Sequence, residues 1–85
     1  MPTKSVVVGS AVGLHARPAA LISEAAGELD TEVTIGNPGE EPVDASSALL
    51  IMTLGSKKGD TVEVSGDNQA AVDKIAAMVE QDLDA

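Results

Sequence analysis

The chain has 85 residues, a length that suits one domain with a modest hydrophobic core. Its formal net charge is −9, with five Lys and Arg residues and no aromatic side chain. We therefore expect no nucleic-acid partner, because phosphate backbones require a basic surface and unpaired bases stack on aromatic rings. The chain has no cysteine and one histidine, so we expect no disulfide, no metal site and no cofactor.

The hydrophobic pattern contains no run that approaches the roughly 20 residues of a membrane-spanning helix. The start of the chain shows no signal-peptide pattern. We therefore expect a cytoplasmic protein without membrane insertion. No linker, repeat or shift of composition divides the sequence, so residues 1–85 are expected to form a single domain.

The first predicted elements are a strand and a helix. Residues 5–8 are rich in β-branched side chains and predict a strand, which a loop over residues 9–13 follows. Pro18 fits the first turn of a helix, where its missing N–H has no intrahelical partner. Gly27 is expected to end that helix in a left-handed conformation. Apolar residues recur on one face of the helix, at positions 19, 22, 26 and 29.

A hairpin of two strands is predicted next. Polar and apolar side chains alternate over residues 32–35, as they do in a half-buried strand. The segment over residues 36–41 contains Asn-Pro-Gly and is a strong turn signal. It is expected to join the first strand to a partner over residues 42–44.

A short apolar helix follows the hairpin. Asp44 and Ser46 are its candidate N-caps, since both side chains can accept hydrogen bonds from the free N–H groups of a first turn. The apolar run continues through Met52, and the helix is expected to end near Gly55.

The last predicted elements are a strand over residues 61–64, where polar and apolar side chains alternate, and a long helix. This helix begins near Asp67 or Asn68, and its apolar face carries Val72, Ile75, Ala76, Val79 and Leu83. Four strands and two longer amphipathic helices can share one core as two layers, with the helices on one face of an antiparallel sheet. The sequence thus predicts an α+β fold of order βαββαβα.

The strongest functional signal is the segment Gly-Leu-His-Ala-Arg-Pro-Ala over residues 13–19, which places His15 at or just before the first residue of a helix. The free N–H groups of Ala16 and Arg17 and the positive end of the helix dipole suit an anion there. The guanidinium of Arg17 suits phosphate oxygens. Since a neutral imidazole can attack phosphorus and hold it covalently, we interpret His15 as a phosphoacceptor, with Ala16 and Arg17 as phosphate-binding residues.

Residues 13–19 fit, at every position, the active-site pattern of the HPr family, the histidine-containing phosphocarriers of the bacterial phosphoenolpyruvate-dependent sugar phosphotransferase system. The chain also resembles that family in length and in the order of its elements. A looser resemblance covers residues 47–55, where HPr proteins carry a regulatory serine and a short helix. The resemblance implies an open-faced β-sandwich with strand order 1-4-2-3.

The resemblance further implies a phosphocarrier that is not itself an enzyme and that acts as a monomer. His15 would accept a phosphoryl group through Nδ1 from enzyme I and pass it to the IIA domains of sugar permeases. Both partners would dock on a surface around the histidine that comprises Ala20, Ala48, Leu49 and Met52.

Ser47 stands at the position of the family's regulatory serine. Two neighbours depart from the family pattern, because Ser46 replaces a common basic residue and Ala48 a larger aliphatic one. Regulatory phosphorylation of Ser47 and a purely structural role of Ser46 or Ser47 as a helix cap are therefore both open, and the departures favour the cap.

Two other functional classes can be weighed against a phosphocarrier. An HPr-like protein that regulates by binding alone is the first, and His15 argues against it because such relatives tend to lack the histidine. An acyl carrier protein is the second, since it is also small, acidic and poor in aromatic residues. The strands predicted over residues 5–8 and 61–64 and the absence of an Asp-Ser-Leu motif argue against it. A sugar-related and a nitrogen-related branch of the phosphotransferase system both stay open.

Overall fold

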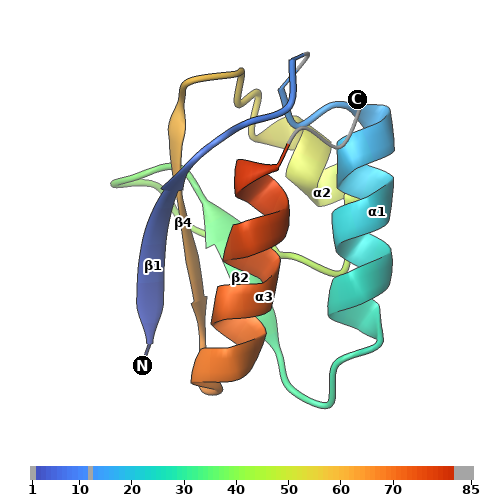
Figure 1. The fold of residues 1–85 in the computed structure, drawn as a ribbon, viewed down its shortest axis with the longest axis vertical. Helices are drawn as coiled ribbons and strands as arrows, with labels where there is room; N and C mark the ends of the chain where they lie inside the picture. The colour runs from blue at the N-terminus through green and yellow to red at the C-terminus, as the bar shows by residue number, and fades with distance from the viewer. Residues whose placement is uncertain (1, 12, 82–85) are drawn as a thin grey trace.

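The computed structural model describes residues 2–11 and 13–81. A four-stranded antiparallel sheet has the order β1-β4-β2-β3 (Figure 1). The elements in chain order are β1 (Thr3–Val7), α1 (Ala16–Gly27), β2 (Val33–Gly36), β3 (Val43–Asp44), α2 (Ala48–Thr53), β4 (Thr61–Gly66) and α3 (Gln69–Glu80). The predicted order βαββαβα is confirmed, and the strand order is the one that the resemblance implied.

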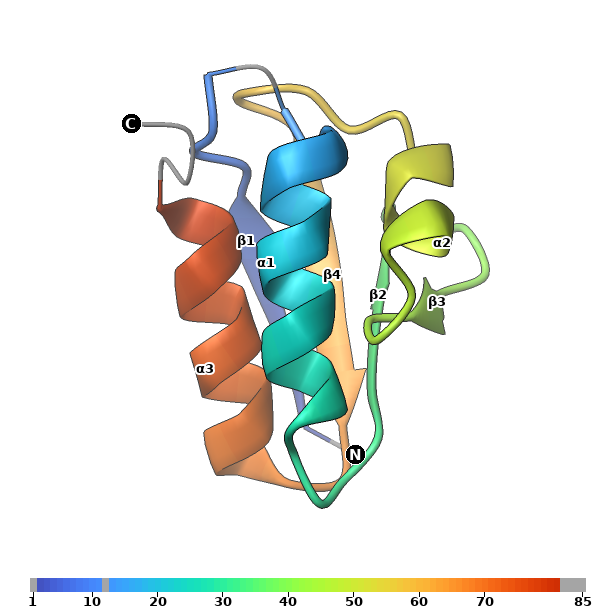
Figure 2. The same cartoon turned by 90° about the vertical axis from the view of Figure 1, so that its right-hand side faces the viewer.

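Helices α1 and α3 lie side by side on one face of the sheet and leave its other face open (Figures 1 and 2). Helix α2 lies beside α1 at one end of the molecule, next to β3. The core between the two layers is aliphatic, with Ile22 of α1, Ile35 of β2 and Ile75 of α3 fully buried. Each such side chain contributes about 2 kcal/mol to stability, so burial holds the two layers together without any aromatic ring.

The first and last elements differ from the prediction at their ends. Strand β1 begins at Thr3 rather than at Ser5, because Thr3 pairs with Ser65 of β4 and their hydroxyl oxygens lie 3.0 Å apart. Helix α3 is capped by Asn68, as expected, and the Asn68 Oδ1 atom accepts a hydrogen bond from the N–H of Ala71 at 3.1 Å. Leu83, predicted on the apolar face of this helix, lies outside the described residues.

The predicted left-handed stop at Gly27 is wrong. Gly27 is the last residue of α1, it has no positive φ, and the next residue, Glu28, is still right-handed, with φ −84° and ψ −10°. The N–H of Glu28 donates to the carbonyl oxygens of Glu24 and Ala25, at 3.2 and 3.3 Å. Because this tightened last turn satisfies those carbonyls, the helix ends without a left-handed residue.

For α2, the predicted cap at Ser47 is confirmed, whereas the predicted caps Asp44 and Ser46 are wrong. Ser47 is the N-cap, and its Oγ atom accepts a hydrogen bond from the N–H of Leu50 at 3.3 Å. The Asp44 carboxylate instead accepts the N–H and the hydroxyl of Ser46, at 2.9 and 2.7 Å. These two bonds hold the pKa of Asp44 below its ordinary value of 3.8. Asp44 and Ser46 thus form a turn that leaves the capping position to the next residue.

Candidate functional site

His15 is the N-cap residue of α1, as the sequence predicts. Its backbone is extended, with φ −87° and ψ −171°, and its carbonyl oxygen accepts the N–H of Ala19 at 2.9 Å. The side chain makes no capping hydrogen bond and is exposed. The backbone of His15 is therefore held by the helix, while no described residue occupies either of its ring nitrogens.

The first turn of α1 offers free donors beside this ring. Neither the Ala16 N–H nor the Arg17 N–H has an acceptor among residues 2–11 and 13–81, and Pro18 has no N–H to satisfy. Arg17 is exposed, and within the same residues its guanidinium makes no ion pair or hydrogen bond. The helix start therefore combines two free N–H groups, the positive end of the dipole and a permanent cation.

The loop before His15 is attached to the segment before β4. The N–H of Leu14 donates to the Ser56 carbonyl oxygen at 3.0 Å. Gly13 has φ +76°, and a Cβ there would lie 2.4 Å from the Ser56 carbonyl oxygen and 2.8 Å from the Lys57 Cα. Only glycine fits this contact without a shift of the backbone, which explains why the histidine motif begins with that residue.

A groove of about 270 Å³ lies where these two loops meet. Its lining comprises Leu14, His15, Met52, Gly55, Ser56 and Lys57. Sequence reasoning missed Ser56 and Lys57. Neither residue had a signal in the sequence, because a pair of consecutive lysines at 57 and 58 is typical of a solvated turn.

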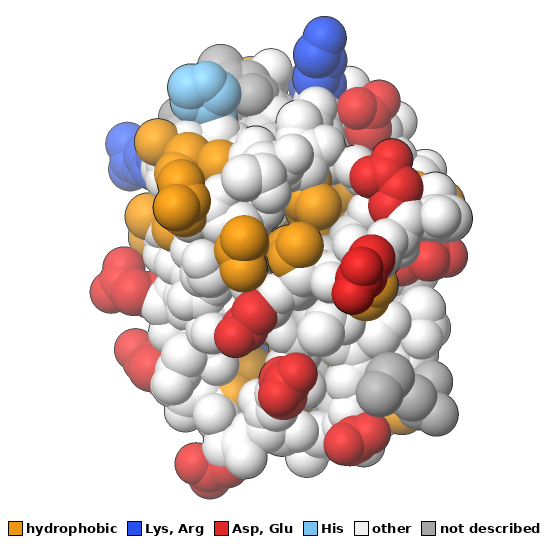
Figure 3. Space-filling view, turned by 180° about the vertical axis from the view of Figure 1, so that it is seen from behind, with side chains coloured by type: hydrophobic (Ala, Val, Ile, Leu, Met, Phe, Trp, Pro, Cys, Tyr) orange, Lys and Arg blue, Asp and Glu red, His pale blue; other side chains and the backbone are white. Residues whose placement is uncertain are grey.

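An exposed apolar patch lies next to the histidine. Its most exposed member is Leu49 of α2, with 70% of its surface accessible, and Leu50 and Met52 are exposed at 39% and 38%. Ala20 of α1 is exposed as well, whereas Ala48 is half-buried and packs against the core. Figure 3 shows the histidine at the edge of a group of hydrophobic side chains, with basic side chains on both sides of it and acidic ones over the rest of this face.

Leu21 is a further exposed hydrophobic residue that the sequence did not single out. It lies on α1, the helix that packs against α2. Its exposure is 38%. Its position in an amphipathic helix gave no sign of this, because an apolar side chain beside the buried face is normally counted as core.

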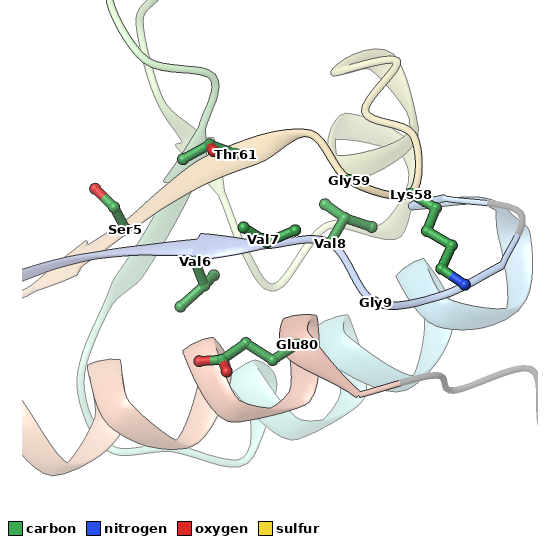
Figure 4. Close-up of a pocket in the computed structure, with 9 residues that line it drawn as sticks. All are labelled: Ser5, Val6, Val7, Val8, Gly9, Lys58, Gly59, Thr61 and Glu80. Carbon is green, nitrogen blue, oxygen red and sulfur yellow. The ribbon is translucent and has the colours of Figure 1, made fainter.

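A larger hollow, of about 680 Å³, lies at the edge of β1, and His15 is not among its lining residues. Figure 4 shows Val6 and Glu80 on one side of this strand, Val7 and Thr61 on the other, and Lys58 near the segment at Gly9. The hollow contains neither a histidine nor a cluster of carboxylates. Within the part of the chain that the structure describes, no group of His, Asp and Glu has the arrangement of a metal site.

Comparison with known proteins identifies the family. Residues 2–81 match the family model described as "PTS HPr component phosphorylation site". The chain is 36% identical to the phosphocarrier protein HPr of Streptomyces coelicolor, in an alignment that covers 99% of this chain and 94% of that protein. The chain belongs to the HPr family of phosphocarriers. HPr proteins relay phosphoryl groups within the phosphotransferase system and are carriers rather than catalysts.

Two further HPr-family proteins are similar to this chain. The phosphocarrier protein NPr of Shewanella violacea is 36% identical, and the alignment covers 95% of this chain and 91% of that protein. The crystal structure of an HPr from Bacillus anthracis superposes with a TM-score of 0.84 at 31% identity, covering 92% of this chain and 95% of that one. Among residues 2–11 and 13–81, no helix has the length and the apolar character needed to cross a membrane.

Proposed function

We propose that His15 accepts a phosphoryl group from phospho-enzyme I and passes it to IIA domains of sugar permeases. One observation carries this proposal, namely an exposed imidazole at a helix start where, among the described residues, neither the ring nor the two first N–H groups have a hydrogen-bond partner. In the forward step, the Nδ1 lone pair attacks phosphorus while the bond between phosphorus and the donor breaks, and the donor leaves with that electron pair. Transfer to the acceptor reverses the same bond changes at His15.

The charges around His15 suit the phosphorylated state. A phosphoryl group brings about two negative charges to the ring, and the N–H groups of Ala16 and Arg17 lie at the positive end of the α1 dipole. The guanidinium of Arg17 can donate to phosphoryl oxygens without first breaking another bond, since it has no partner among the described residues. Arg17 therefore acts as the charge partner of the phosphohistidine.

The patch formed by Ala20, Ala48, Leu49 and Met52 is our proposed docking surface for both donor and acceptor. Exposed apolar side chains of this kind favour association when a partner covers them, and the patch adjoins the phosphoacceptor. Ala48 contributes least of the four, because it already packs against the core.

Ser47 serves α2 as its cap, and we propose no second function for it without a direct test. Phosphorylation would place the phosphate on the oxygen that accepts the Leu50 N–H, next to the Asp44 turn. Incubation with an HPr kinase and ATP, with Ser47→Ala as control, tests this modification. A stable phosphate on the wild type alone would assign a regulatory role to the serine.

The transfer proposal is tested by incubation with phosphoenolpyruvate and enzyme I, followed by intact mass spectrometry at alkaline pH. We expect one acid-labile phosphoryl group per chain, none on His15→Ala, and the same far-UV circular dichroism for both proteins. Arg17→Ala should slow transfer about tenfold or more, because a hydrogen bond to a charged group contributes about 1.5–3 kcal/mol. Phosphate on the His15→Ala protein at the wild-type level would refute the assignment.

Two properties of the protein are proposed on the resemblance and are tested separately. Fractionation of the source cells is expected to recover the chain in the cytoplasm. Sedimentation is expected to give the mass of a monomer.

A further inference from the structure

Lys57 lies beside the candidate phosphoacceptor. The hydrogen bond from the Leu14 N–H to the Ser56 carbonyl joins two loops, and His15 and Lys57 are the next residues along each of them. Both residues line the 270 Å³ groove. Lys57 is exposed, and its ammonium has no hydrogen bond or ion pair among residues 2–11 and 13–81. Lys57 therefore brings a cation that has no partner among the described residues to the groove that contains the imidazole.

The backbone that carries Lys57 is fixed from two directions. Ser56 is only 6% exposed, and its hydroxyl donates to the Asn37 Oδ1 atom at 2.9 Å, while the Asn37 amide donates to the Leu54 carbonyl at 3.0 Å. On the other side, the Asp60 carboxylate accepts the backbone N–H of Lys57 at 3.0 Å. The lysine is thus presented at a defined place in the groove, and only its side chain is free to move.

The neighbouring lysine provides an internal contrast. Lys58 lines the hollow at the edge of β1, and Figure 4 shows its side chain extending toward the segment at Gly9. It does not line the groove that contains His15. Two adjacent residues of the same charge therefore face different surfaces, and only Lys57 shares a groove with the imidazole.

We propose that Lys57 is a phosphoryl-binding residue, whose ammonium donates to a phosphoryl oxygen of phospho-His15 as a second cation in addition to Arg17. This inference rests on the proposed function and deepens it. Arg17 does not line the groove, so the two cations approach the imidazole from different positions. With two positive charges the site neutralises the two negative charges that a phosphoryl group carries. A compact ammonium on a flexible chain suits this task, because it can follow the phosphoryl group without a fixed donor geometry.

The test uses protein phosphorylated chemically with phosphoramidate, so that no partner protein is needed. The pKa of the second phosphoryl ionisation is read from the ³¹P NMR shift of phospho-His15 in the wild type, Lys57→Gln, Lys57→Arg and Lys58→Gln. A cation that contacts the phosphoryl group favours its dianion and lowers this pKa. We expect Lys57→Gln to raise this pKa by about 0.8 units, the effect of one unit charge at roughly 4 Å in water, and Lys57→Arg to bring the pKa most of the way back to the wild-type value.

Lys58→Gln is the matched control, since it removes the same charge one residue away, and it should shift the pKa by less than half as much. An equal shift for Lys57→Gln and Lys58→Gln would overturn the proposal, because it would show only the overall charge of this end of the molecule. An unchanged titration in Lys57→Gln would overturn it too, and a rise in KM for enzyme I in that variant would then assign Lys57 to docking. A wild type that takes no phosphoryl group on His15 from phospho-enzyme I refutes the proposed function itself. That result is distinct from the two outcomes that overturn the role of Lys57.

Discussion

Replacement of Gly13 by alanine should separate the two loops that form the groove. Gly13 has φ +76°, and a Cβ would stand 2.4 Å from the Ser56 carbonyl oxygen and 2.8 Å from the Lys57 Cα, both of them backbone atoms. The left-handed backbone costs about 1 kcal/mol for alanine. Relief of the contact must also stretch or break the bond from the Leu14 N–H, which adds about 1 kcal/mol. We expect Gly13→Ala to lose about 2–3 kcal/mol of stability.

Two other glycines separate these contributions. Gly55 also has a positive φ, of +67°, but nothing lies within 4 Å of its added Cβ, so Gly55→Ala should cost only the backbone term of about 1 kcal/mol. Gly27 has neither a positive φ nor a close neighbour and lies at the end of α1, so Gly27→Ala should raise stability by about 0.5 kcal/mol.

Urea unfolding followed by far-UV circular dichroism measures all three variants. The transfer assay adds a functional readout, in which Gly13→Ala should be slow because Lys57 moves away from His15. A loss of stability in Gly13→Ala no larger than that in Gly55→Ala would refute the role of the loop contact.

Three further variants test the docking surface and the start of α2. Leu49→Asp should fold normally, since the side chain is 70% exposed, and should raise the KM for enzyme I about tenfold or more, because a partner would have to desolvate an unpaired carboxylate. Glu40→Lys is its control and should change KM less than a few-fold, whereas unfolding of Leu49→Asp in circular dichroism would place Leu49 in the core. Ser47→Ala should lose about 1 kcal/mol in urea unfolding through the missing cap, and no loss would show that the Leu50 N–H finds another acceptor. Asp44→Ala should lose at most about 0.5 kcal/mol at neutral pH, since the carboxylate is exposed and screened. The folded-state pKa of Asp44 is lowered, so its contribution is present above pH 3.8 and should fade as the pH falls through the lowered pKa; a loss that is constant with pH would contradict this.

Local signals predicted the fold elements well. The place of His15 before α1 follows from Pro18 and the helical spacing after it, because both act within one turn. The order of the strands, in contrast, could not be predicted from local signals. Thr3 pairs with Ser65, and alternation within a strand does not name a partner so distant along the chain, so this order required the family resemblance.

The sequence left the cap of α2 open and did not predict the position of Lys57, and both failures have physical causes. Asp44, Ser46 and Ser47 can all accept a hydrogen bond from the first turn of a helix, so the sequence does not determine which of them is the cap. In the structure the Asp44 carboxylate binds Ser46, and Ser47 is the residue that accepts the N–H of Leu50. Lys57 stands in a polar turn and has the pattern of any solvated lysine. Only the tertiary bond between Leu14 and Ser56 brings it beside the histidine.

The bond from the Leu14 N–H to the Ser56 carbonyl gives a single amide proton a diagnostic value. This proton is shielded from solvent exchange only while the two loops are joined. Its exchange rate with deuterium therefore measures how often a folded molecule opens the groove at His15 without unfolding its core. Comparison with a core amide such as that of Ile75, which is fully buried, distinguishes opening of the groove from unfolding of the whole chain.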